Sequence, residues 1–218
     1  MFSYIEKSEL LKYGGRHFVS EKFLRMCTVE YKKENQPMKW IHEDWNKTFE
    51  LLIIILKGSG KLETPNMNVS FGVGDQIYLI NTTHRLLSYE NIELELIYLP
   101  GPYEAVRFSP TKNNAIYFNK MNLTSVTNAV IVDEIYGKIH ILKLDSVYNG
   151  ILEGDESLFL ICLEGSADFE IGDDSVNLRQ GDQIYINNGA YKIYNCQNAL
   201  FEFIYAPAQK YYDAINIV

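Results

Sequence analysis

Histidine, glutamate and aromatic side chains are the groups in this sequence that could do chemistry. His84 follows an apolar segment, where an imidazole can act as an acid–base group, a ligand-orienting group or a metal ligand. Glu95 and Glu202 sit between apolar residues and could be acid–base groups, but we expect them on the solvent-exposed face of a sheet. The 16 Tyr and 2 Trp offer flat faces for stacking on sugars or planar ligands, although core packing explains most of the tyrosines.

Several other chemistries are not supported by the sequence. The segment Lys57-Gly58-Ser59-Gly60-Lys61 is not a phosphate-binding loop, because the full GxxxxGK[ST] pattern is absent. A nucleophile elbow of the Gly-x-Ser-x-Gly type is also absent. Cys27, Cys162 and Cys196 are odd in number and have no CxxC spacing, so we expect buried free thiols in a reducing cytosol.

Charge and hydropathy exclude two further classes of partner. The formal net charge of −8 repels phosphate backbones, so we expect no binding to nucleic acid. The first fifteen residues carry acidic groups where a signal peptide needs an apolar core, and the longest apolar run, 51–56, is far shorter than the roughly 18 residues that span a bilayer. We therefore expect a cytoplasmic protein without membrane contact.

The sequence contains an internal repeat. Shifted by 107 positions, segment 52–100 aligns with 159–207 without a gap. The alignment places Gly74-Asp75-Gln76-Ile77-Tyr78 on Gly181-Asp182-Gln183-Ile184-Tyr185, five identities in a row. Chance does not hold such a register over this length, so the chain is predicted to be a duplication.

Both repeats have the pattern of β-structure. The β-branched run 51–56 predicts a strand that is buried on both faces. Segments 61–63 and 168–171 alternate polar and apolar residues, which is typical of a strand with one face in water. Further strands are expected over 25–31 and 138–144. We therefore expect an all-β protein of two tandem jelly-roll barrels, with no long helix.

The predicted boundaries follow from the repeat. Residues 1–102 are expected to form the first barrel with an N-terminal extension, and 128–210 the second barrel. Residues 103–127, which follow Pro102 and contain Pro110 and Asn113-Asn114, are expected to be a linker with room for one short element. Residues 211–218 are expected to be a C-terminal tail.

The order of these features resembles the cupin superfamily. A strand ends in Gly58-Ser59-Gly60, a hairpin follows, and then come Gly74-Asp75, the apolar segment 77–80 and His84. Duplicated, the pattern looks like a bicupin. Residues 38–100 are most similar to the effector-binding domain of AraC-type transcription regulators. The resemblance implies two double-stranded β-helix barrels. Only eleven residues follow Pro207, too few for the helix-turn-helix units of such regulators, so we expect no direct reading of DNA.

The same resemblance implies a metal site whose ligands this sequence lacks. Metal-binding cupins supply two His separated by one residue, a Glu a few positions on, and a third His after the Gly-Asp strand. Imidazole and carboxylate suit Fe, Mn, Ni or Zn. The corresponding positions here are Trp45, Lys47 and Leu51, and only His84 is kept.

The second repeat keeps none of these ligands. The corresponding positions are Leu152, Gly154, Leu158 and Tyr191. We therefore expect no cofactor. The alternative is one divalent transition metal in the first barrel, held by His42, Glu50 and His84 after a shift of the loop.

These observations predict a small-molecule-binding bicupin of the sensor type, without a catalytic metal and with no catalytic residue assigned. The expected ligand is a sugar or a small acid. The expected pocket residues are Trp45, Lys47, Leu51, Tyr78, His84, Leu158, Tyr185 and Tyr191. The alternative is a cupin metalloenzyme (isomerase, lyase or dioxygenase) with a degenerate site in the first barrel. Metal-free epimerase-like chemistry on His84 and a purely structural role remain open. We expect a homodimer.

Overall fold

The structure is a computed structural model, which describes residues 2–10, 17–20, 24–31, 38–40, 50–80, 82–88, 90–99, 114–134 and 136–206. The chain divides into two compact units. The N-terminal unit is Leu11–Asn122, and the C-terminal unit combines Met1–Leu10 with Leu123–Val218. Among the described residues, no helix has both the length and the apolar character needed to cross a bilayer.

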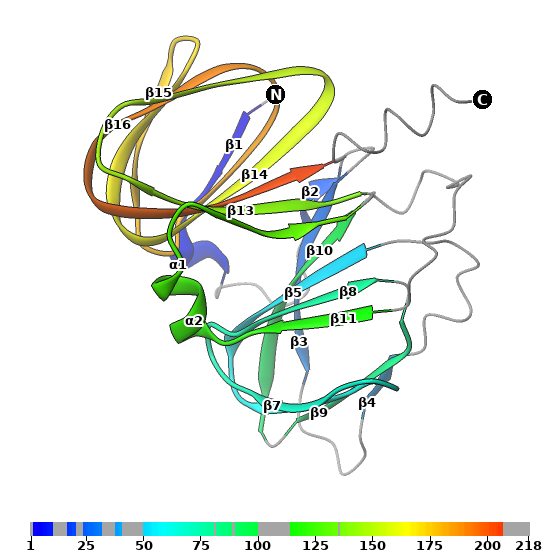
Figure 1. The fold of residues 1–218 in the computed structure, drawn as a ribbon. Coiled ribbons are helices and arrows are strands. Elements are labelled where there is room, and N and C mark those ends of the chain that lie inside the picture. Colours follow the sequence, from blue (N-terminus) through cyan, green and yellow to red (C-terminus); the bar gives the residue numbers. More distant parts are fainter. Residues whose placement is uncertain are drawn as a thin grey trace. The chain divides into compact units, whose positions relative to one another are not determined.

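The N-terminal unit contains two antiparallel sheets (Figure 1). The larger has the order β11-β8-β5-β10-β3-β2, formed by β2 (His17–Ser20), β3 (Arg25–Tyr31), β5 (Glu50–Lys57), β8 (Gln76–Ile80), β10 (Ile92–Leu99) and β11 (Asn114–Phe118). The smaller has the order β4-β9-β6-β7, formed by β4 (Met38–Trp40), β6 (Gly60–Glu63), β7 (Asn68–Phe71) and β9 (His84–Ser88).

The core of this unit lies between its two sheets. Leu51, Ile53 and Ile55 project from β5 toward Leu62 and Leu86 of the smaller sheet, and all five side chains belong to one buried cluster. The alternate residues of β5 are also buried, so the prediction of a strand buried on both faces is confirmed.

The C-terminal unit is one antiparallel sheet that curves round on itself (Figure 1). Its strands are β1 (Phe2–Ile5), β12 (Ala129–Asp133), β13 (Lys138–Leu144), β14 (Tyr148–Ile171), β15 (Asp174–Arg179) and β16 (Gln183–Ala206). Leu158 in the middle of β14 lies opposite Ile186 on one side and Tyr205 on the other, so β16 curls round β14. Register shifts between the two strands allow this bend.

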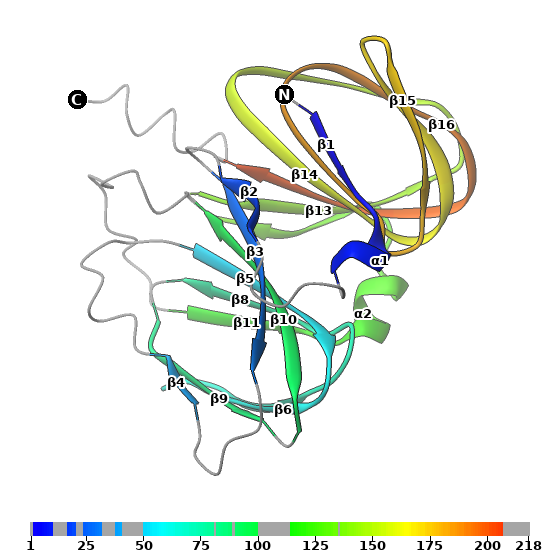
Figure 2. The ribbon, with the colours of Figure 1, turned by 180° about the vertical axis from the view of Figure 1, so that it is seen from behind.

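The first strand of the chain belongs to the C-terminal unit. Strand β1 pairs with β16, from Phe2 opposite Ile186 to Ile5 opposite Gln183. Strand β11, which comes just before the second repeat, pairs instead with β8 of the N-terminal unit. The sheet of each unit is therefore completed by a strand from the segment that precedes the other repeat in the sequence. Figure 2 shows this for β1.

This exchange changes the division of the chain. The predicted first barrel, 1–102, included residues 1–10, which pair with the C-terminal unit. The predicted linker, 103–127, contains β11 and the short helix α2 (Lys120–Ser125) rather than one short element. Pairing partners, and not order in the sequence, decide which unit a strand completes. The predicted tail, 211–218, lies outside the described residues.

The structure also extends the repeat to the start of the chain. Strand β1 and helix α1 (Lys7–Leu10) correspond to β11 and α2 at an offset of 113, with Tyr4 on Tyr117 and Lys7 on Lys120. The offset falls from 113 to 107 because six more residues separate β3 from β5 than separate β13 from Ser157.

Candidate functional site

His84 lies on the core-facing side of the N-terminal unit. It begins β9, and Leu86, two residues later on the same face, belongs to the core cluster. His84 is 5% exposed, and its Nδ1 lies 3.4 Å from the carbonyl oxygen of Thr82. Burial lowers the pKa of His84 from 6.5 to about 4, and the Thr82 carbonyl only partly opposes this. At neutral pH the imidazole is therefore uncharged, with one donor and one acceptor nitrogen.

Three further inward-facing groups come from the neighbouring strands β3 and β10. Tyr98 on β10 packs against the core and lies between Leu51 of β5 and Arg25 of β3 in the sheet register. Burial raises the pKa of Tyr98, the Cys27 thiol raises it further and Arg25 lowers it. Burial also raises the pKa of Cys27, against an opposing effect of Arg25. The cation, the thiol and the phenol hydroxyl thus act on one another electrostatically.

The corresponding positions of the C-terminal unit are occupied by tyrosines. Tyr191 corresponds to His84, and Tyr205 corresponds to Tyr98, each at an offset of 107. Burial is the main cause of the raised pKa of Tyr191, and the neighbouring Tyr205 and Tyr148 raise it further. Tyr205 and Tyr191 therefore lie near each other in the interior of the unit.

Aromatic rings fill the interior of the C-terminal unit. Tyr191 stacks on Phe169 at 5.8 Å between ring centroids, and Phe2 stacks on the same ring at 5.7 Å. Tyr148 lies 5.3 Å from Phe203, also between centroids. The ring of Tyr191 crosses Gly150, where an added Cβ would lie 2.2 Å from Tyr191 Cζ.

The predicted pocket residues divide between the two faces of the sheets. Leu51 and His84 face the core of the N-terminal unit, and Leu158 and Tyr191 face that of the C-terminal unit. Trp45 and Lys47 lie outside the described residues. The other two predicted pocket residues, Tyr78 and Tyr185, occupy the opposite, also buried, faces of β8 and β16.

Those opposite faces carry a matched pair of hydrogen bonds. The Tyr78 hydroxyl donates to the Glu50 carboxylate, and Tyr185 shares a hydrogen bond of 3.1 Å with the Ser157 hydroxyl. Ser157 corresponds to Glu50 at the offset of 107. Alternation along the strands therefore directs Tyr78 and Tyr185 away from the cores that contain His84 and Tyr191.

The donor set does not fit the metal ion that the fold implies. The alternative site required His42, Glu50 and His84 together. Glu50 and His84 lie on opposite faces of their sheets, Glu50 is bonded to Tyr78, and His42 lies outside the described residues. Within the described part of the chain, no three His, Cys, Asp or Glu side chains are grouped so that they could hold a metal. Imidazole and carboxylate ligands must converge to bind such an ion.

Two expectations from the sequence are corrected by burial. Glu95 and Glu202 were expected on a solvent-exposed face, and that expectation is wrong, because both are 0% exposed. Both lie in the middle of central strands. Their side chains are on the face of the sheet that points away from the core cluster, and this outer face is buried as well. Cys27 and Cys162 are buried free thiols as predicted, whereas Cys196 is half-buried.

Sequence reasoning missed Arg25, Cys27 and Tyr98 as members of the site. A signal was present, since the identity of Tyr98 and Tyr205 is part of the repeat and Arg25 and Cys27 lie in a predicted strand. Only the register between β3 and β10 shows that Tyr98 and Arg25 are neighbours.

Comparison with known proteins shows the fold. No family model matches the sequence, and a search of curated proteins finds no match. A cupin 2 conserved barrel domain protein from Leptotrichia buccalis is 9% identical, with a TM-score of 0.65 over 94% of this chain and 96% of that one. A bacterial pirin from Escherichia coli in complex with nickel(II) is 10% identical, with a TM-score of 0.60 over 95% and 100%.

A salicylate 1,2-dioxygenase variant from Pseudoaminobacter salicylatoxidans is 8% identical, with a TM-score of 0.60 over 89% of this chain and 73% of that one. These likenesses show that the chain has the cupin fold, and the predicted fold is confirmed.

Proposed function

We propose that the chain binds a small molecule on the inward face of the N-terminal unit, beside His84, without a metal ion. The observation that carries this proposal is the difference between two corresponding positions. In the C-terminal unit the ring of Tyr191 fills the interior against Phe169 and Tyr148, and Tyr205 and Tyr148 act electrostatically on its hydroxyl. In the N-terminal unit the shorter, uncharged His84 stands at that position, and Tyr98 stands at the position that corresponds to Tyr205.

The chemistry of the surrounding groups favours a small organic acid over a sugar. Arg25 brings a fixed positive charge close enough to change the pKa of Tyr98. A guanidinium binds a carboxylate through paired, charge-assisted hydrogen bonds. Tyr98 and a neutral His84 add a hydroxyl donor and an imidazole that can donate or accept. Apolar Leu51 and Leu79 from the adjacent strands supply contact area for the body of the ligand.

A sensor role fits this arrangement better than catalysis on a metal. Pirin from Escherichia coli was solved with nickel(II), and the dioxygenase is an enzyme, so the fold alone decides neither metal binding nor catalysis. Among the described residues of this chain, no set of donors converges as a metal site requires. Elemental analysis of protein purified without a metal-affinity tag tests this part, and one equivalent of Fe, Mn, Ni or Zn per chain, lost in His84→Ala, would overturn it.

Ligand binding is tested by a thermal-shift screen of small carboxylic acids and sugars, followed by calorimetry of the hits. We expect a small acid to raise the Tm, and Tyr98→Phe to weaken its binding about tenfold. The matched control is Tyr205→Phe, the corresponding change in the C-terminal unit, which should leave the affinity unchanged. No stabilisation by any compound of the panel, or equal effects of the two substitutions, would contradict the proposal.

A further inference from the structure

Each Gly-Asp turn binds a segment from a distant part of the sequence through one side chain. In the C-terminal unit, Asp182 Oδ2 accepts a hydrogen bond from the Tyr4 hydroxyl at 2.9 Å, and Oδ1 accepts one from the backbone N–H of Lys7 at 3.1 Å. Asp182 also accepts the N–H of Arg179 within its own turn at 3.0 Å. The carboxylate therefore joins the turn to β1 and to the start of α1.

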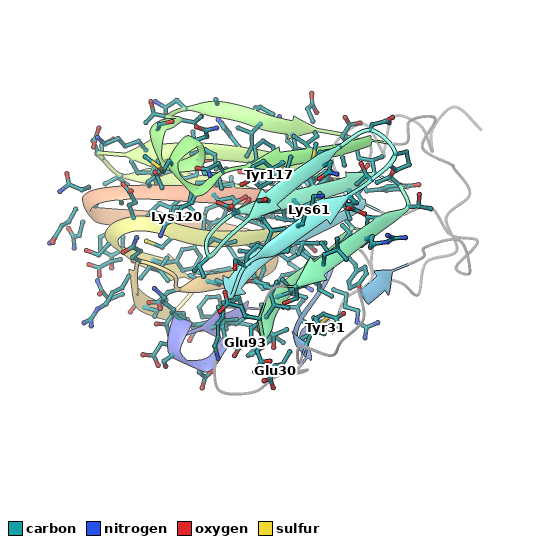
Figure 3. The ribbon with its side chains drawn as sticks, turned by 90° about the horizontal axis from the view of Figure 1, so that it is seen from below. Glu30, Tyr31, Lys61, Glu93, Tyr117 and Lys120 are labelled. Atoms are coloured by element: carbon teal, nitrogen blue, oxygen red, sulfur yellow. The ribbon has the colours of Figure 1, made fainter. Side chains whose placement is uncertain are left out.

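The N-terminal unit repeats this arrangement bond for bond. Asp75 Oδ2 accepts the Tyr117 hydroxyl at 2.7 Å and the N–H of Gly72 at 2.8 Å, and Oδ1 accepts the N–H of Lys120 at 2.9 Å. Tyr117 lies in β11 and Lys120 begins α2; both are labelled in Figure 3. The same contacts at two places indicate a built recognition site rather than an accident of packing.

The glycine of each turn makes room for a lysine of the bound segment. Gly74 and Gly181 have φ of 86° and 90°, which favours glycine. An added Cβ would lie 2.6 Å from Lys120 Cδ at Gly74 and 2.4 Å from Lys7 Cδ at Gly181. The aliphatic part of the lysine thus lies directly over the turn. The segment ends in a buried leucine, Leu10 or Leu123.

The first residue of each segment distinguishes the two sites. Phe2 stacks on Phe169 with an interplanar angle of 8° inside the C-terminal unit. Ala115 takes the corresponding place in the N-terminal core, where Leu62 corresponds to Phe169. A phenylalanine would overfill the smaller site, and an alanine would leave a void in the larger one. Size therefore directs Phe2–Leu10 to the C-terminal unit.

We propose that Asp182 and the edge of β16 that pairs with β1 form a binding site for an extended segment of the pattern Phe-x-Tyr-x-x-Lys-x-x-Leu, and that the N-terminal segment of a second copy of this chain can fill it in place of the chain's own segment. The strand pairing, the carboxylate bonds and the aromatic stacking described above for residues 2–10 are all supplied by residues beyond 123. None of them requires the segment to belong to the same chain. This proposal is independent of small-molecule binding.

The test separates the segment from the folded chain. A specific protease site is inserted after Gly15, the folded protein is cut, and gel filtration with mass spectrometry follows the released fragment. We expect the fragment to stay bound and to be displaced by a fluorescent peptide of residues 1–10. The same peptide with Tyr4→Phe should bind about tenfold more weakly. Loss of the fragment on cutting, with the circular dichroism of the remainder unchanged, would overturn the proposal.

Matched variants locate the site and its second occupant. Asp182→Asn in the cut chain should weaken peptide binding by a similar factor, whereas Asp75→Asn, the same change in the other turn, should leave it unchanged. Uncut chain incubated at high concentration should form a dimer by light scattering, and Asp182→Asn should change the dimer fraction. An uncut chain that stays monomeric and takes up no fluorescent peptide on warming would refute exchange between copies. Equal effects of the two substitutions on peptide binding would also refute the assigned site.

Discussion

The hydroxyl of Tyr4 donates a hydrogen bond to the carboxylate of Asp182 at 2.9 Å, across 178 positions of sequence. Tyr117 makes the same bond to Asp75 at 2.7 Å. These two bonds fix strands that lie far from their partners in the sequence. They also give the repeated Gly-Asp pair a role that its turn geometry alone does not explain.

The bond between Tyr4 and Asp182 should contribute measurably to stability. We expect Asp182→Asn to lower the free energy of unfolding by about 2 kcal/mol, because three donors lose a charged acceptor. Tyr4→Phe should cost less, about 1 kcal/mol, since it removes one of those donors. Urea unfolding at pH 7 measures both. If Asp182→Asn proves no more costly than Tyr4→Phe, the carboxylate does not hold the segment as described.

Buried His84 should make the protein sensitive to mild acid. Its pKa falls from 6.5 in the unfolded chain to about 4 in the folded one, so the unfolded state binds the proton more tightly. The contribution of neutral His84 to the free energy of unfolding is complete above pH 6.5 and is lost as the pH falls through 4. The loss amounts to about 3 kcal/mol in all. Unfolding midpoints at pH 7 and 4.5 should therefore differ more in the wild type than in His84→Gln. Identical pH dependence would show that His84 titrates normally.

The ring of Tyr191 lies over Gly150, so we expect position 150 to tolerate no side chain. Gly150→Ala places a Cβ 2.2 Å from Tyr191 Cζ, so the ring must move within an aromatic core. We expect a loss of about 1–3 kcal/mol, typical of overpacking. Gly72→Ala is the control, because its Cβ would meet no atom within 4 Å and should change the stability by less. Thermal unfolding compares them, and equal losses would contradict the close packing.

The thiols should differ in their reactivity. Burial, with smaller effects of Asp182 and Cys196, raises the pKa of Cys162 to about 12, so the thiolate that reacts with alkylating reagents is scarce at pH 8. Cys196 is half-buried, so we expect iodoacetamide to modify it before Cys162 and Cys27 in the folded protein. Mass spectrometry of timed samples measures the order. Modification of Cys162 first would show that the C-terminal core opens more readily than the edge that carries Cys196.

Strand positions and the repeat were predictable because their signals are local. The run 51–56, the alternation in 61–63 and the strands 25–31 and 138–144 all appear as strands. Five identical residues at the Gly-Asp turn fixed the offset of 107. In each case neighbouring residues carry the information, through the period of two along a strand.

The site was less predictable, because the face of the sheet on which a side chain lies inside the core depends on packing partners that are distant in the sequence. Of the predicted pocket residues, Leu51 and His84 lie on the face that packs in the core, whereas Tyr78 lies on the opposite face and bonds to Glu50. Glu95 was expected in water and is buried, because the outer face of its sheet is covered too. The alternation of residues along a strand indicates that its two faces differ, but it does not indicate which face packs against the core.

The sequence by itself determined that the chain is a duplicated all-β protein with cupin-like turns and few metal ligands. Identical residues at a fixed spacing and the chemical types of the residues are both properties of the sequence alone. Only the tertiary structure decided that β1 completes the C-terminal unit and β11 the N-terminal one. A strand edge accepts any segment whose side chains match its pockets, and the contacts of Phe2 and Tyr4 exist only after the chain has folded.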